Sequence, residues 1–170
     1  MANKDALIGE LKYESGLTRK MLERVPFDNP GWQPHEKSFT LARLATHVAE
    51  IPHWISRIAT TDDWDFAVRG FSKQIAQSRE ELLDIFESKL NKAIADLQAM
   101  NDEDFEKTWV VSNGSLMRRE LVKKVAIRGW GFSHLIHHRG QLSVYLRLLD
   151  VAVPGLQDQR HGHAHGGQQR

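Results

Sequence analysis

Apolar residues recur every three or four positions along most of the chain, which is the period of an amphipathic helix. This pattern predicts a first helix over about residues 4–25 and a second helix over about residues 39–60. Ser38 is the expected N-cap of the second helix. Pro52 lies inside the second pattern, so we expect a kink or a local irregularity there.

The middle of the chain combines a loop-rich connection with a well-marked third helix. The stretch 61–77 follows no single period and predicts loops. Ser78 and Glu81 have the spacing of a capping box, in which two side chains cover free backbone N–H groups at a helix start. The apolar period then predicts a helix from this box to about Met100.

The second half of the chain predicts a hairpin and then a fourth helix. Asn113–Gly114 separates two short apolar runs, so we expect a hairpin over residues 108–117. Helical periodicity returns over about 123–149, where Gly129 and Gly131 weaken the first part. Four amphipathic helices bury their apolar faces most simply against one another. The predicted fold is therefore an all-α four-helix bundle with a small hairpin or irregular segment between helices 3 and 4.

Length and composition describe one domain followed by a short tail. A chain of 170 residues fits one compact domain, which we expect over residues 1–156. Residues 157–170 are rich in His, Gly and Gln and predict a disordered tail. No apolar run is long enough for a membrane span, and the first residues lack the apolar stretch of a signal peptide. We therefore expect a cytoplasmic location and no membrane partner.

The absence of cysteine and the balanced charge exclude several classes of chemistry. Without cysteine the chain has no disulfide, no thiolate nucleophile and no cysteine-based metal site. Any metal ion must then be held by His, Asp or Glu, and thiol chemistry would need a thiol from outside. Lys and Arg number 23 against 22 Asp and Glu, which is not the charge balance of a nucleic-acid binder. The basic residues between 118 and 128 are expected to form a solvated helix face.

A histidine pair in the fourth helix carries the most informative chemistry. His134 and His138 are four residues apart, so both rings lie on one helix face, about one turn apart. Gln141 and Tyr145 continue the same polar stripe. Two imidazoles at this spacing can bind one metal ion. The alternatives are a surface pair, or core histidines that form hydrogen bonds to their neighbours.

The second helix offers a third candidate ligand. His47 is flanked by apolar residues on both turns, which predicts that it faces inward. Three ligands from two helices leave an open coordination position, as in catalytic metal centres. Glu50 lies on nearly the same face and is expected to orient His47, accept a proton or bind the metal, unless it is a plain surface carboxylate.

Five residues close in sequence to these histidines also have expected locations or roles. Arg139 is expected on the surface, with a substrate carboxylate as the alternative partner. Gly140 is expected to let a neighbouring helix approach closely, and His53 is expected to be structural. Trp54 and Trp130 are expected in the core, with a pocket wall as the alternative.

Two segments carry a resemblance to a known family. The run from His138 to Leu149, which follows His134, resembles the C-terminal signature of the DinB family. Residues 44–54 resemble the first-histidine region of the same family, and the resemblance covers the chain to about residue 156. It implies a four-helix bundle in an up-down-down-up arrangement. It also implies a divalent metal ion, zinc or nickel, held by His47, His134 and His138.

The resemblance further implies a metal-dependent enzyme that acts on a small-molecule substrate. Characterised relatives point to a thiol-dependent S-transferase, or a related hydrolase or isomerase, with a low-molecular-weight thiol as co-substrate. Gln141 or Tyr145 would then hydrogen-bond a bound water or the substrate, and Glu50 would handle a proton. The family also implies a homodimer. The alternative is a non-enzymatic metal-binding protein of a stress response that acts through dimerisation.

Overall fold

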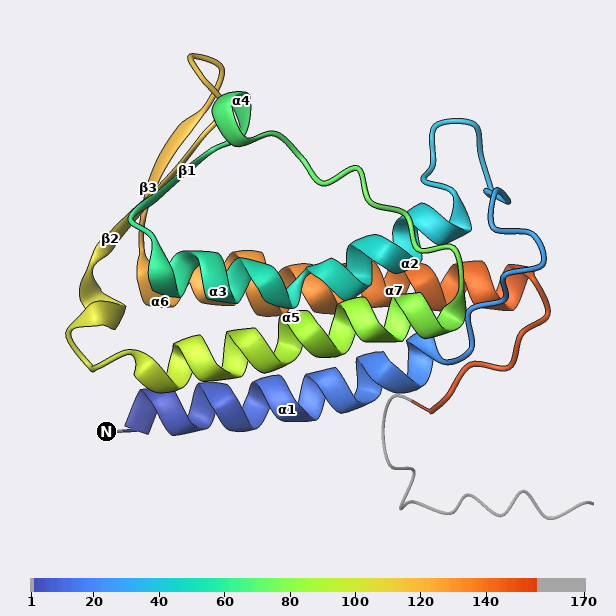
Figure 1. Ribbon diagram of the computed structural model, residues 1–170, viewed down its shortest axis with the longest axis horizontal. Helices are drawn as coiled ribbons and strands as arrows, with labels where there is room; N and C mark the ends of the chain where they lie inside the picture. Colours follow the sequence, from blue (N-terminus) through green and yellow to red (C-terminus); the bar gives the residue numbers. More distant parts are fainter. Residues whose placement is uncertain (1, 156–170) are drawn as a thin grey trace, which may run out of the picture.

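The computed structural model describes residues 2–155, and Figure 1 shows how their helices and strands are arranged. The tail predicted over residues 157–170 lies outside the described residues. No helix within 2–155 combines the length and the apolar character that crossing a membrane requires.

Most of the chain forms long helical tracks that lie side by side (Figure 1). The tracks are α1 (Ala2–Leu22), α2 and α3 (Leu41–Glu50 and Pro52–Thr60), α5 (Arg79–Ala99), and α6, η2 and α7 (Lys123–Ala126, Ile127–Ser133 and His134–Leu148). α5 packs against α1, α2 and α3, while α7 packs against α1 and α2. α1 and α7 run in one direction, and α2, α3 and α5 run in the opposite direction (Figure 1).

The second helix is divided in two at the predicted proline. α2 ends at Glu50 and α3 begins at Pro52, because proline has no N–H to donate and is tolerated only in the first turn of a helix. The predicted cap at Ser38 is wrong. Thr40 is the N-cap, and its hydroxyl accepts a hydrogen bond from the Arg43 N–H at 3.3 Å.

The start of α5 confirms the predicted capping box. The Ser78 hydroxyl accepts a hydrogen bond from the Glu81 N–H at 3.2 Å. The Glu81 carboxylate accepts one from the Gln77 N–H at 2.8 Å, one residue before the cap itself. Both side chains therefore cover free N–H groups at this helix end, as the sequence predicts.

A three-stranded sheet closes one end of the helices. β2 (Thr108–Ser112) and β3 (Arg118–Val122) form a hairpin whose turn lies at the predicted Asn113–Gly114, where Gly114 has a φ of +53°. The predicted range of 108–117 is too short, because residues 113–117 form the loop and the second strand follows it. β1 (Asp63–Asp65) adds to β2 in parallel, in the order β1-β2-β3. The sequence did not predict β1. The chain is thus mostly helical, and the purely all-α class was too narrow.

Two short helices and the basic residues complete this end. α4 (Phe66–Arg69) follows β1, and η1 (Asp104–Glu106) precedes β2. The predicted basic helix face between 118 and 128 is wrong, because its first two residues lie on strand β3. Four of the five basic residues between 118 and 128 form ion pairs with acidic partners. These pairs are Arg118–Glu120, Lys123–Asp62, Lys124–Glu106 and Arg128–Glu10.

The apolar side chains form two core clusters along the helical tracks. One cluster lies between α2, α5 and α7 and includes Leu44 and Leu135. The other lies between α3, η2 and the sheet and includes Ile55, Phe132 and the fully buried Trp109. The segment from η2 into α7 passes from one cluster to the other, and His134 lies at this junction.

Candidate metal centre

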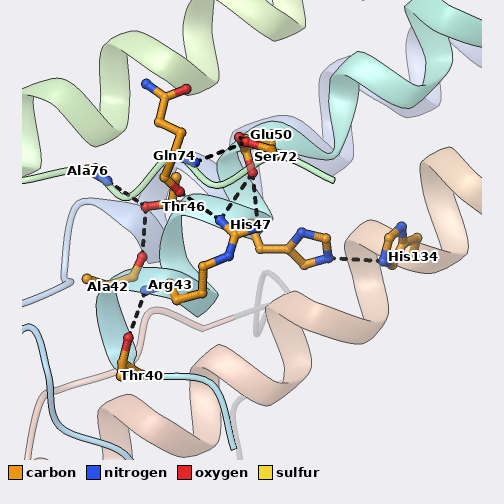
Figure 2. A network of polar contacts seen from close by, with 10 residues as sticks. All are labelled: Thr40, Ala42, Arg43, Thr46, His47, Glu50, Ser72, Gln74, Ala76 and His134. Atoms are coloured by element: carbon orange, nitrogen blue, oxygen red, sulfur yellow. Dashed lines mark hydrogen bonds and ion pairs between the residues drawn. The ribbon is translucent and has the colours of Figure 1, made fainter. Parts of the chain in front are cut away.

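Three histidines from two helical tracks converge at one point. His47 comes from α2, and His134 and His138 come from the first two turns of α7. The Nε2 atoms of His47 and His134 lie 3.2 Å apart, and Figure 2 shows the two rings pointing toward each other. One ring nitrogen from each of the three lies within 4.8 Å of the other two. The structure therefore brings together the three residues that the sequence singled out.

The backbone before α7 positions His134. Residues 127–133 form a π-helix, and the His134 N–H reaches back five residues to the Gly129 carbonyl. Such segments shift the side chains that follow around the helix axis and often occur at functional sites. His138 then follows one α-helical turn later, which puts its ring beside that of His134 with 4.6 Å between the centroids.

A glycine lets the π-helix approach α3 closely. A Cβ atom at Gly131 would lie 2.5 Å from Cγ1 of Ile55, which is far inside ordinary contact distance. The sequence assigned this kind of role to Gly140, and that prediction is wrong. A Cβ atom at Gly140 meets no described atom within 4 Å, because this position faces solvent.

The surroundings keep all three imidazoles neutral. Burial, followed by the neighbouring His138 and His134, lowers the pKa of His47 to about 3. Burial, followed by His138, lowers the pKa of His134 to about 4, although the Trp130 backbone partly opposes this. Burial also lowers the pKa of His138. Neutral imidazole is the form that binds a metal ion, so the cluster is ready to bind one at neutral pH.

The outer nitrogens of the candidate ligand rings differ in their partners. Nδ1 of His138 lies 2.7 Å from Oε1 of Gln141. An amide oxygen only accepts, so Nδ1 carries the proton and Nε2 keeps its lone pair. Nδ1 of His134 is buried and has no partner at hydrogen-bonding geometry in residues 2–155, the Trp130 backbone included. Gln141 thus contacts the candidate ligand His138 itself, whereas we expected from the sequence that it contacts a bound water or the substrate.

The other two predicted catalytic residues lie around the cluster. The Tyr145 hydroxyl donates to the Phe39 carbonyl at 3.1 Å and so ties α7 to the loop before α2. The Glu50 carboxylate accepts from Arg43 at 3.3 Å and from Ser72, as Figure 2 shows. Its hydrogen bonds within the described chain go to these two residues and not to His47. Catalytic roles for Glu50, Gln141 and Tyr145 stay predictions.

Arg139 packs α7 against α1 and does not lie on the surface. Its side chain is 6% exposed, and both the surface location and the substrate-carboxylate alternative are wrong. Its Nη2 lies 2.6 Å from the Glu14 carboxylate, as an ion pair outside hydrogen-bond angles. Its Nη1 donates to the Glu14 carbonyl at 2.9 Å and to the Thr18 hydroxyl at 3.1 Å. These contacts fix α7 on α1.

A cavity of about 180 Å³ adjoins the histidine cluster, and Trp54 lies in its wall, which agrees with the pocket-wall alternative for this residue. The sequence did not predict the other residues of the wall. His47 lies in its wall, together with the expected structural residue His53 and with Arg57. A signal was present in the sequence, because His53 and Arg57 are four residues apart and share one face of α3. The long connection between α4 and α5 forms the opposite wall.

That connection is held over α2 by three contacts, which Figure 2 shows. The Ala76 N–H donates to the buried Thr46 hydroxyl at 2.9 Å. Arg43 donates to the Gln74 carbonyl at 2.9 Å, and Ser72 donates to Glu50. The wall opposite His47 is therefore attached to the same helix that carries His47.

The histidine cluster fits a divalent metal ion. Zinc–nitrogen bonds of about 2.0–2.1 Å in a tetrahedral site place two ligand nitrogens about 3.3 Å apart. The 3.2 Å separation of the His47 and His134 Nε2 atoms agrees with this value. Three protein ligands also leave one position for water or a substrate, as catalytic zinc sites do. Imidazole suits zinc, nickel, copper and iron, so the donor set alone does not name the metal.

Comparisons with known proteins agree with the sequence resemblance. The chain matches the DinB family over residues 1–169. It is 18% identical over 147 residues to the uncharacterized protein YjoA of Bacillus subtilis (strain 168), over 86% of this chain and 91% of that protein.

Two crystal structures share the fold. One is a DinB-like protein from Bacillus cereus ATCC 10987, with a TM-score of 0.69 and 20% identity, over 89% of this chain and 95% of the other. The other is YjoA from Bacillus subtilis, with a TM-score of 0.68 and 17% identity, over 91% of this chain and 99% of the other. At these identities the likeness shows a common fold.

Proposed function

We propose, from the premise that this chain belongs to the DinB family, that it is a metal-dependent enzyme whose metal ligands are His47, His134 and His138. One observation carries the proposal: three imidazoles from two helical tracks bring their nitrogens within 4.8 Å of one another. Zinc or nickel is the proposed ion. When bound, such an ion supplies Lewis acidity, which generates a nucleophile from water or a thiol at neutral pH.

The proposed reaction is transfer of a small organic group to or from an external thiol, or the related hydrolysis or isomerisation. The chain has no cysteine, so the thiol has to come from a low-molecular-weight co-substrate. Gln141 would hold the His138 ring in one tautomer, and Glu50 would accept a proton at the edge of the cavity beside His47. We further propose a homodimer, as the family resemblance implies, and a cytoplasmic location.

Metal content is the first measurement that tests this function. We would determine zinc and nickel by elemental mass spectrometry on the full chain with His161, His163 and His165 replaced by alanine, so that the tail binds no metal. His47→Ala and His134→Ala are the test variants, and His137→Ala is the matched control, because His137 is exposed and adjoins His138. We expect about one metal per chain, lost in both test variants and kept in the control.

Two outcomes would change the conclusion. A chain that binds no metal after incubation with zinc and nickel would contradict the metalloenzyme. A chain that binds metal tightly, but whose metal exchanges no water and accepts no small thiol, would favour the non-enzymatic alternative. Relaxation of bulk water with cobalt in the site distinguishes an open position from a closed one.

A further inference from the structure

The cavity beside His47 holds more positive charge than its own residues neutralise. Arg43, Arg57 and Lys89 line it, against the single carboxylate of Glu50. Glu50 is already bonded to Arg43 and Ser72. The side chains of Arg57 and Lys89 form no hydrogen bond or ion pair with any residue between 2 and 155, although the charge of Glu50 acts on Arg57 through space. Two cations therefore face the cavity without a counter-charge bonded to them.

The surrounding tryptophans fix the position of Arg57 and leave its donors free. Its guanidinium lies 3.7 Å from the ring centroid of Trp64 and 4.6 Å from that of Trp54. Cation–π contacts of this kind hold a guanidinium against the ring faces without using its N–H groups as hydrogen-bond donors to another residue. Nε of Arg57 is buried and has no partner in the described chain. A buried donor without an acceptor is costly, which favours a bound acceptor.

A second unpartnered polar atom borders the same cavity. Nδ1 of His53 is buried and has no hydrogen-bond partner among residues 2–155. Burial, followed by the charges of Arg57, Lys89 and Lys92, lowers the pKa of His53 to about 4, although Asp96 opposes this. His53 is therefore neutral at pH 7 and can donate one hydrogen bond or accept one.

The remaining wall of the cavity is aromatic. Trp54 and Phe66 are buried, and Phe71 stacks on Phe66 with 4.4 Å between ring centroids and an interplanar angle of 13°. The three rings line the cavity together with the cationic residues. A ligand that fits has one anionic end and an apolar body.

The volume limits the ligand to a small molecule. A cavity of roughly 150 Å³ is large enough to hold benzene, and this one measures about 180 Å³. A benzene ring with one carboxylate is therefore near the upper limit of the enclosed part. A carboxylate also matches the planar fork of an arginine better than it matches a lysine.

We infer that this cavity binds a small organic acid, whose carboxylate contacts Arg57 while its apolar body lies against Trp54, Phe66 and Phe71. Lys89 and His53 border the carboxylate, and the end of the molecule near His47 lies toward the histidine cluster. This assignment gives the substrate class of the proposed enzyme and rests on that proposed function. Arg57 is a binding residue in this account, because it contacts the acid and not the reacting atoms.

Binding of benzoate to the full chain tests the inference without any assay of activity. We would titrate benzoate into metal-free protein by isothermal calorimetry, with benzamide as the uncharged analogue and inorganic phosphate as an anion without an apolar body. Arg57→Gln is the test variant. Arg128→Gln is the matched control, because Arg128 is exposed and pairs with Glu10, away from the cavity.

We expect benzoate to bind at least tenfold more tightly than benzamide or phosphate. Arg57→Gln should weaken benzoate about 10- to 100-fold, the usual loss for hydrogen bonds to a charged group. Arg57→Lys should recover part of the affinity, and Arg128→Gln should leave it unchanged. If Arg57→Gln does not fold by circular dichroism, Lys89→Gln and the comparison with benzamide carry the test.

Three results would overturn the inference: equal binding of benzoate and benzamide, binding of phosphate as tight as benzoate, or full benzoate affinity in a folded Arg57→Gln variant. Zinc stoichiometry, measured on a second portion of each preparation after incubation with zinc and removal of the excess, separates the two proposals. Zinc without selective benzoate binding rejects the acid site alone. Benzoate binding that depends on Arg57, in a chain that binds no metal, rejects the metalloenzyme and keeps the acid site.

Discussion

At the scale of single residues, Gln141 is the contact that orients the candidate ligand His138. Its amide oxygen lies 2.7 Å from Nδ1 of His138 and so directs the lone pair of Nε2 away from Gln141. Outer contacts of this kind contribute about 10- to 100-fold to metal affinity. We expect Gln141→Leu to weaken zinc binding by about tenfold in a competitive chelator titration. The matched variant His137→Gln should leave it unchanged, and an unaltered affinity in Gln141→Leu would show that the contact is dispensable.

Arg139 and Glu14 form a residue pair whose role is stability. Their side chains are 6% and 15% exposed, so removal of one partner leaves a buried charge without compensation. We expect Arg139→Met to lower the free energy of unfolding by about 3–5 kcal/mol, measured by urea denaturation. Arg128→Met, which breaks an exposed pair with Glu10, should cost about 0–1 kcal/mol. Similar losses in the two variants would contradict this account of Arg139.

At the scale of elements, the π-helix and α3 depend on one glycine. A methyl group at Gly131 meets Ile55 at 2.5 Å, so we expect Gly131→Ala to destabilise the fold by about 1–3 kcal/mol. The shift that relieves the clash should also displace His134 and weaken zinc binding. Gly140→Ala is the control, because it meets no described atom and should stabilise the helix by up to about 1 kcal/mol. Thermal unfolding and the chelator titration measure both effects.

The elements that the sequence predicts are those with a local signal. Ser78 with Glu81 and the proline at position 52 act within a few residues, and the structure confirms the helix start and the break. β1 has three residues and gains its pairing from β2, more than forty positions later, so no local pattern marks it. The π-helix depends in the same way on the approach of Ile55 to Gly131.

At the scale of the whole molecule, buried neutral histidines make stability depend on pH. The pKa of His53 falls to about 4 in the folded chain, while an unfolded histidine titrates near 6.5. Below pH 6.5 the unfolded state therefore binds more protons than the folded state, and stability decreases as the pH falls. We expect the melting temperature of the metal-free protein to decrease steadily from pH 6.5 to pH 4.

His53→Gln isolates the contribution of His53 to this dependence. The variant should lose less stability than the parent over the same pH interval, since glutamine does not titrate. Circular dichroism melts at matched ionic strength measure the two slopes. Parallel slopes in the variant and the parent would show that His53 does not hold a lowered pKa in the folded chain.

The candidate site is predictable from the sequence only in part, because the rest of it depends on tertiary contacts. The three candidate ligand histidines lie within two helices whose periodicity is local, so the face of each helix can be derived from the sequence and the helices paired. The cavity exists because the connection after α4 passes over α2 and is bonded to Thr46 and Arg43. Neither the path of a loop nor the contact of Arg57 with two tryptophan rings leaves a short-range signal.

The break between α2 and α3 has a consequence for how ligand length is selected. His47 lies before the break, and His53, Trp54 and Arg57 lie after it, on the next helix. We expect a substitution at Ile51 or Pro52 to shift one set of side chains against the other without replacing any of them. In the proposed enzyme, these two positions would set the distance from the metal ion to the carboxylate contact. On this proposal, a change at the break would let the enzyme accept a longer or shorter acid while every binding residue stays the same.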